Sequence, residues 1–163
     1  MTEFLLVYVV LERLLELVIS NRNTARLRAQ GAVEAGAKHY PIMVLLHVSW
    51  LAAIALWVAT RHPEPNAFYA GVYVLLQAFR FWVMLSLGRF WTTRIITLPG
   101  APLVMRGPYK FLRHPNYVVV ALEIAILPLV WSALSLAVAF SILNGWMLSV
   151  RIRAEEQALS ARR

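Results

Sequence analysis

The residues of this sequence best suited to bind a charged small molecule lie in a segment rich in proline and glycine, 98–117, which reads LPGAPLVMRGPYKFLRHPNY. Pro115 restricts the residue before it to an extended conformation, so His114 is expected at the kinked start of a helix. Free backbone N–H groups at a helix start attract anions. His114 and Arg113 therefore predict a corner suited to a carboxylate or a phosphate. The same residues also fit a plain helix start with a snorkelling arginine and an interfacial tyrosine, Tyr117.

A second group of candidates lies near the C-terminus, where the sequence reads RIRAEE over 151–156. Arg151 and Glu155 are four residues apart on one helix face, a spacing most often used by a surface ion pair. Together with Glu34, Glu155 and Glu156 are also the acids expected on the side of the molecule that carries the basic loops. A ligand with a cationic group would need them there, so a binding role is the alternative to the ion pair.

Composition excludes several kinds of chemistry. The chain has no cysteine, and all of its 8 acidic residues are glutamate. This excludes thiolate metal sites, cysteine nucleophiles and motifs that require aspartate. His47 stands alone in an apolar segment, so we interpret it as a hydrogen-bonded core residue and predict no metal site.

The elements that position these residues are predicted to be membrane helices. The chain has 163 residues, of which 60% are hydrophobic and 15% charged, and its mean hydropathy is +0.63. An ordinary soluble domain is less apolar and more highly charged. Segments that approach the roughly 20 helical residues needed to cross a bilayer are 3–20, 41–60, 67–88, 116–131 and 133–150. The sequence thus predicts an all-α, polytopic integral membrane protein with about five transmembrane helices, the last two forming a helical hairpin.

Charge predicts the orientation of these spans. The net charge is +8, and thirteen of the 16 basic residues fall in 21–40, 89–116 and 151–163. Basic residues concentrate in cytoplasmic loops, so we expect a prokaryotic cytoplasmic membrane with these loops and the C-terminus, including Arg162 and Arg163, in the cytoplasm. A basic stripe with interleaved stacking aromatics is missing outside these loops, so we predict no nucleic-acid partner.

Charged residues inside the predicted spans need partners. The first span contains Glu12, Arg13 and Glu16, so a helix that lies in the interface is the alternative to a spanning one. Arg80 in the third span is costly in hydrocarbon unless it is paired. We expect Glu123 as its partner and Glu16 as the second choice, in a structural ion pair or in the wall of a substrate cavity.

Three short motifs follow one another in the second half of the chain: G-x-Y at 107–109, R-H-P-x-Y at 113–117 and R-x-x-x-E-E at 151–156. Together they resemble the isoprenylcysteine carboxyl methyltransferase family of integral membrane methyltransferases. The resemblance covers about 89 to the C-terminus, and the first 88 residues in general topology. It implies S-adenosylmethionine as the cofactor, bound without a Rossmann domain, in agreement with the missing G-x-G-x-x-G motif.

By position, the resemblance implies a cofactor pocket on the cytoplasmic face. Its cofactor-binding residues would be Leu103, Val104, Tyr109, His114, Pro115, Asn116, Tyr117 and Glu155. Arg151 and Glu155 are implied as catalytic residues, with Arg151 contacting the methyl acceptor. Aromatic and apolar groups can hold adenine, the helix start and His114 can meet a carboxylate, and Glu155 can pair with a cation.

The stretch 90–104, FWTTRIITLPGAPLV, resembles small prokaryotic members of the family. It implies a lipophilic small-molecule acceptor that enters from the membrane lipid, with a carboxyl or hydroxyl oxygen as in a polyketide-derived lipid or an isoprenylcysteine-like compound. Phe90, Trp82 and Trp91 are expected beside its tail.

We therefore predict an S-adenosylmethionine-dependent O-methyltransferase made of a single domain, 1–163. In it, 1–88 provides three N-terminal spans and 89–163 provides the motif loop, the helical hairpin and the tail that form the cofactor site. A small non-catalytic membrane protein that binds or transports lipid is the alternative from another class. Among enzymes, the alternatives are a phospholipid methyltransferase and a membrane reductase.

Overall fold

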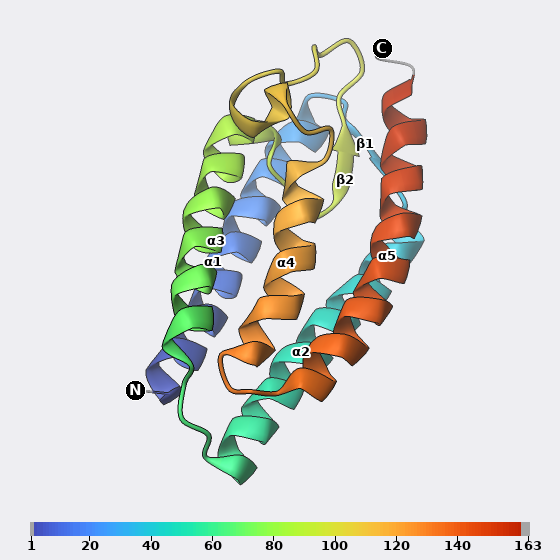
Figure 1. The fold of residues 1–163 in the computed structure, drawn as a ribbon. Coiled ribbons are helices and arrows are strands. Elements are labelled where there is room, and N and C mark those ends of the chain that lie inside the picture. Colours follow the sequence, from blue (N-terminus) through green and yellow to red (C-terminus); the bar gives the residue numbers. More distant parts are fainter. Residues whose placement is uncertain (1, 161–163) are drawn as a thin grey trace.

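The computed structural model describes residues 2–160, so Arg162 and Arg163 of the predicted cytoplasmic tail lie outside the described residues. Within the described part, long helices lie side by side in an elongated bundle, and irregular segments cover one end of it (Figure 1). The long helices are α1 (Thr2–Ala29), α2 (Tyr40–Arg61), α3 (Ala67–Leu87), α4 (Pro115–Leu129) and α5 (Leu134–Ser160). The predicted all-α fold is confirmed.

Three stretches of helix are long and apolar enough to cross a membrane: Ala37–Arg61, Ala67–Phe90 and Leu134–Ser160. The helix Pro115–Leu129 is apolar but shorter. Among the described residues α1 does not meet the same criterion, because Glu12, Arg13 and Glu16 interrupt its apolar stretch. The helices support an integral membrane protein in which α1 and α4 differ from the three long apolar helices.

Local sequence explains where the apolar helices begin. The Asn66 side chain caps α3, accepting hydrogen bonds from the backbone N–H groups of Phe68 at 3.0 Å and Tyr69 at 3.3 Å. Both α2 and α4 carry proline in the first turn, where a missing N–H breaks no helical hydrogen bond. The predicted hairpin of the last two helices is present, and Ala133 donates to the Pro128 carbonyl across its turn at 3.0 Å.

Two helices are longer than hydropathy predicts. α1 continues past residue 20 to Ala29, and α5 continues past residue 150 to Ser160. Hydropathy marks where a chain leaves the membrane, whereas the polar residues that follow still form helix readily. The extension of α5 is what carries Arg151 and Glu155 up to the irregular segments.

A small antiparallel sheet was not predicted. β1 (Val33–Ala35) pairs with β2 (Ile95–Thr97), with Glu34 opposite Ile96. An ion pair between Arg94 Nη1 and Glu34 Oε1, 2.8 Å apart, reinforces the pairing. The sheet therefore ties the segment after α1 to the segment that precedes the motifs.

Short 3₁₀ helices complete this end of the molecule: η1 (Ala37–His39), η2 (Gly88–Phe90) and η3 (Gly107–Lys110). At the other end, a buried core that includes Trp50, Ile54, Leu127 and Trp131 joins α2 to the hairpin. The Trp57 indole N–H donates to the Trp131 carbonyl at 3.0 Å, which fixes the hairpin turn against α2.

Candidate active site

A cavity of about 510 Å³, here called the loop cavity, lies between the irregular segment 87–117 and the end of α5. Eight of the nine residues predicted for the site line it: Leu103, Val104, Tyr109, His114, Asn116, Tyr117, Arg151 and Glu155. Pro115, the ninth, is the buried first residue of α4 and does not line the cavity. The hairpin therefore brings the motif segment and the RIRAEE segment to one place.

His114 meets both carboxylates of the RIRAEE segment. Its Nδ1 lies 3.7 Å from Glu155 Oε2 and its Nε2 lies 3.4 Å from Glu156 Oε1. The Glu155 carboxylate raises the pKa of the His114 imidazole above its ordinary value, and Glu156 adds to this while burial opposes it. His114 and Glu155 thus place a protonatable imidazole beside a carboxylate in the cavity wall.

Arg151 is 5% exposed, and its Nη2 donates a 2.8 Å hydrogen bond to the Thr93 carbonyl. Its guanidinium carbon lies 5.9 Å from the centre of the Tyr117 ring. Arg151 and Glu155, both described, are not within ion-pair distance of each other. The surface ion pair that the sequence suggested is therefore not formed. Arg151 is buried, and the Glu155 carboxylate lies near His114.

Tyr109 and Asn116 supply further polar groups. Burial raises the pKa of the Tyr109 hydroxyl, and the nearby Glu155 carboxylate adds to the shift, so this hydroxyl stays protonated. The buried Asn116 Oδ1 has no hydrogen-bond partner among the described residues. An unpartnered polar atom in a cavity wall is a group that a ligand can satisfy.

A second cavity of about 320 Å³, the helix cavity, lies among α1, α2, α4 and α5 and has a mainly apolar wall. Four residues line both cavities: Thr92, Asn116, Tyr117 and Arg151. A pocket under the polar loop therefore meets a pocket between the membrane helices at Arg151.

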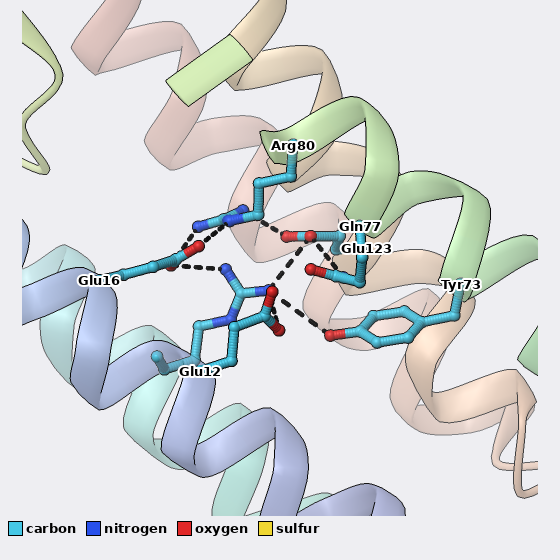
Figure 2. A network of polar contacts seen from close by, with 7 residues as sticks. Glu12, Glu16, Tyr73, Gln77, Arg80 and Glu123 are labelled. Carbon is cyan, nitrogen blue, oxygen red and sulfur yellow. Dashed lines mark hydrogen bonds and ion pairs between the residues drawn. The ribbon is translucent and has the colours of Figure 1, made fainter. Parts of the chain in front are cut away.

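A network of charged and polar side chains, the buried ion network, lies between the helices (Figure 2), and its members Arg13, Glu16, Arg80 and Glu123 line the helix cavity. Its members come from α1, α3 and α4 and are Glu12, Arg13, Glu16, Tyr73, Gln77, Arg80 and Glu123. Arg80 donates to both predicted partners, with Nη1 2.6 Å from Glu123 Oε2 and Nη2 2.7 Å from Glu16 Oε2. The prediction that Arg80 is paired is confirmed, and it uses both carboxylates at once.

Sequence reasoning missed several residues of these walls. Thr93 joins three segments, because its hydroxyl lies 2.9 Å from the Ser20 hydroxyl and 3.1 Å from that of Tyr40, while its carbonyl accepts from Arg151. The adjacent threonines in the stretch 90–104 were the available signal. His47 is hydrogen-bonded as predicted, with Nδ1 2.8 Å from the Met43 carbonyl, yet it also lines the helix cavity.

The aromatic residues expected beside an acceptor tail separate in the structure. Phe90 lines the loop cavity and Trp91 lines the helix cavity. Trp82 is 50% exposed and lines neither of these cavities. Among the three, Trp82 is therefore not brought to the site.

Fold and site together define a helical membrane protein in which a polar loop and a helix end enclose one pocket above a second, apolar one. The sequence matches the isoprenylcysteine carboxyl methyltransferase (ICMT) family over residues 69–161. The chain belongs to this family of membrane methyltransferases.

Two bacterial relatives cover nearly the whole chain. The chain is 37% identical over 158 residues to the uncharacterized protein YpbQ of Bacillus subtilis, covering 95% of this chain and 94% of the relative. It is 29% identical over 152 residues to an uncharacterized protein of Haemophilus influenzae, covering 91% of this chain and 88% of the relative. No solved structure matches the chain significantly.

Proposed function

We propose that the protein is an S-adenosylmethionine-dependent O-methyltransferase that acts on a lipophilic acceptor in a prokaryotic cytoplasmic membrane. The observation that carries the proposal is the meeting of the loop cavity and the helix cavity at Arg151 and Tyr117. The loop cavity has the more polar wall of the two and lies under the basic loops, and the helix cavity has a mainly apolar wall and lies among the spans. A methyl donor from the cytoplasm and an acceptor from the bilayer can meet at this junction.

The residues of the loop cavity fit S-adenosylmethionine. A volume of about 510 Å³ lies within the usual range for small-molecule sites. Leu103, Val104 and the half-buried Tyr109 offer apolar and aromatic surface for adenine, and Glu155 offers a carboxylate for a cationic group. His114 and the start of α4 suit the methionine carboxylate, and Asn116 Oδ1 still lacks a hydrogen-bond partner. When bound, this cofactor supplies a methyl group on a positively charged sulfur.

The side chains of the protein would then promote transfer by holding the acceptor and the donor in place. The hairpin of α4 and α5 holds Tyr117 and Arg151 at the junction, and the Thr93 carbonyl fixes the direction of the Arg151 guanidinium. Arg151 would orient the acceptor oxygen and favour its deprotonated form, the acceptor proton having passed to bulk water. The oxygen–carbon bond would then form as the donor's sulfur–carbon bond breaks, and S-adenosylhomocysteine would be the leaving group. Burial of the junction excludes water from the methyl group.

Orientation follows from the same arrangement. The loop cavity lies at the end of the bundle that carries the basic segments 21–40 and 89–116, so we place that end in the cytoplasm. The helix cavity then lies at membrane depth. A single domain, 1–163, provides both pockets in this proposal, with membrane lipid as its surroundings and no metal or nucleic acid taking part.

Calorimetric titration of the detergent-purified protein with S-adenosylhomocysteine tests the proposal. We expect saturable binding that Glu155→Gln weakens at least tenfold, because the carboxylate charge is lost. Glu156→Gln is the matched control, since Glu156 is adjacent and also near His114 but does not line the loop cavity. Folded wild-type protein that binds no S-adenosylhomocysteine would refute the proposal and favour a non-catalytic lipid-binding or transport protein.

A further inference from the structure

The helix cavity has a polar floor about two helical turns below the junction. On each of three helices a residue near the junction is followed seven positions away by a polar residue that also lines the cavity. The pairs are Tyr40 and His47 on α2, Asn116 and Glu123 on α4, and Arg151 and Asn144 on α5. Seven residues keep one helix face and span roughly 10 Å. Since α2 and α4 begin, and α5 ends, toward the loop end (Figure 1), each distal residue lies farther from the loop end than its partner at the junction.

Two floor residues present polar atoms without partners. The His47 Nδ1 lies 2.8 Å from the Met43 carbonyl, which only accepts, so Nδ1 carries the proton and Nε2 of the neutral ring keeps a free lone pair. Asn144 is 1% exposed, and its Oδ1 has no partner among the described residues. The buried Trp50 indole N–H, in the same cavity wall, is likewise unpartnered there. Buried polar groups are normally satisfied, so Asn144 Oδ1 and the Trp50 N–H indicate a ligand that satisfies them, and His47 Nε2 offers that ligand a further acceptor.

The floor favours a neutral ligand group. Glu123 is already satisfied, since its carboxylate accepts from Arg13, Arg80 and Gln77. The buried ion network beside the floor sets three carboxylates against two guanidinium groups. Both guanidinium groups are therefore already paired, and the floor atoms that face the cavity, a neutral ring nitrogen of His47 and an amide oxygen of Asn144, offer no positive charge to an anion. A hydroxyl can donate to His47 Nε2 or Asn144 Oδ1 and can accept from the Trp50 N–H.

We propose that the methyl acceptor carries a second polar group, a neutral hydroxyl, which binds at the floor against His47 and Asn144. Its methylated oxygen lies about two helical turns away at the junction beside Arg151, and the apolar wall holds the carbon skeleton between them. His47 and Asn144 are then specificity-determining residues for an amphipathic acceptor with two oxygen functions. This inference rests on the proposed function, because the junction is the place of methyl transfer only if the loop cavity holds the methyl donor.

A pair of rigid probes tests the floor separately from the donor site. In p,p′-biphenol two hydroxyl oxygens lie about 10 Å apart, close to the rise of two helical turns, and p-phenylphenol lacks one of them. Calorimetry with protein saturated by S-adenosylhomocysteine gives the affinity for each probe. We expect wild-type protein to bind p,p′-biphenol about fivefold to tenfold more tightly, the value of one neutral hydrogen bond.

Variants of the floor should remove this preference. Asn144→Leu keeps the size of the side chain, and His47→Leu is the second variant. The affinity ratio should fall in each of them and reach about one when both substitutions are combined, while S-adenosylhomocysteine still binds. Ser149→Ala is the control, since it removes a polar side chain from α5 outside both cavities and should keep the wild-type ratio.

The outcomes separate the two proposals. Wild-type protein that binds S-adenosylhomocysteine but binds both probes equally, or neither probe, would overturn the inference and leave the proposed function standing. A preference that persists undiminished in Asn144→Leu and His47→Leu would overturn it as well. Failure of the wild-type protein to bind S-adenosylhomocysteine would overturn the proposed function and this inference together.

Discussion

Two adjacent glutamates on α5 have different surroundings although both approach His114. Glu155 lines the loop cavity and its side chain is 30% exposed, whereas Glu156 lies outside the cavity wall and is 39% exposed. Glu156 also lies 3.6 Å from Arg113, whose side chain is 67% exposed. The outer pair holds the start of α4 against α5, and Glu155, which also approaches His114, faces the loop cavity.

Stability should depend on pH through His114. Glu155 and then Glu156 raise the pKa of this imidazole in the folded protein. The protonated ring therefore stabilises the fold fully below the ordinary histidine pKa, and this contribution is lost as the pH rises through the raised value. We expect the free energy of unfolding of wild-type protein to fall across that window by about 0.5 kcal/mol relative to His114→Gln, because partly exposed pairs contribute little. Denaturant unfolding in micelles at several pH values measures it, and parallel profiles would contradict it.

Arg151 should affect turnover more than cofactor binding. We expect Arg151→Gln to change the affinity for S-adenosylhomocysteine less than about twofold but to lower methyl transfer about 100-fold, the range for loss of one oriented charge near a reacting atom. Transfer of labelled methyl groups from S-adenosylmethionine into membrane lipid extracts measures the rate. Arg153→Gln is the control, because exposed Arg153 hydrogen-bonds to Ser149 within α5 and to no other residue of 2–160. Full activity of Arg151→Gln would remove Arg151 from the acceptor role.

At the scale of elements, the contact between η3 and α3 depends on a glycine. Gly107 has φ of +56°, a conformation that side chains disfavour. A Cβ at this position would lie 3.0 Å from the Ser86 Cβ, closer still to its hydroxyl, and 3.2 Å from Trp82 Nε1. The glycine of the G-x-Y motif thus lets η3 approach α3, which sets the position of Tyr109.

Gly107→Ala should therefore lower the free energy of unfolding by about 1–3 kcal/mol, from strain in φ and from overlap with Ser86. Adding Ser86→Gly removes the overlap but not the strain, so the double variant should recover part of the loss. Chemical denaturation of the single and double variants measures both effects. A fully stable Gly107→Ala variant would show that η3 can move away from α3 without loss.

The helices predicted most accurately are those whose first residues are set by a nearby capping residue or proline. The predicted span 67–88 matches Ala67–Leu87, because Asn66 caps an unbroken apolar stretch, and 41–60 matches Tyr40–Arg61 with its proline in the first turn. The sheet could not be predicted, since its register pairs Val33 with Thr97 and short strands carry no signal of a distant partner.

At the scale of the whole molecule, the sequence predicts the cavity-lining residues that belong to motifs. It does not predict those that reach a cavity only through helix packing. The motif residues from Leu103 to Glu155 meet because the hairpin brings α5 back beside the start of α4. Thr93, His47 and Asn144 belong to the cavity walls only because α1, α2 and α5 turn particular faces toward one another. No spacing within one segment reveals which helix faces will pack together.

The buried ion network joins α1 to α3 and α4, so it should act on the stability of the whole bundle. Arg80→Met leaves Glu16 and Glu123 with Arg13 as their remaining guanidinium in the network, and an uncompensated buried charge of this kind costs about 3–5 kcal/mol. We expect thermal unfolding in detergent to show that loss. Arg26→Met is the control, because Arg26 is an exposed arginine on the same α1 helix that the network anchors.

The network should also behave as one unit rather than as separate pairs. Adding Glu16→Gln and Glu123→Gln to Arg80→Met removes the carboxylates that lost their partner, so the triple variant should be more stable than Arg80→Met by about 1–3 kcal/mol. Losses that simply add across the three substitutions would mean that each side chain stabilises the bundle through its own packing. In that case α1 would be held against α3 and α4 by packing contacts and not by the ion pairs.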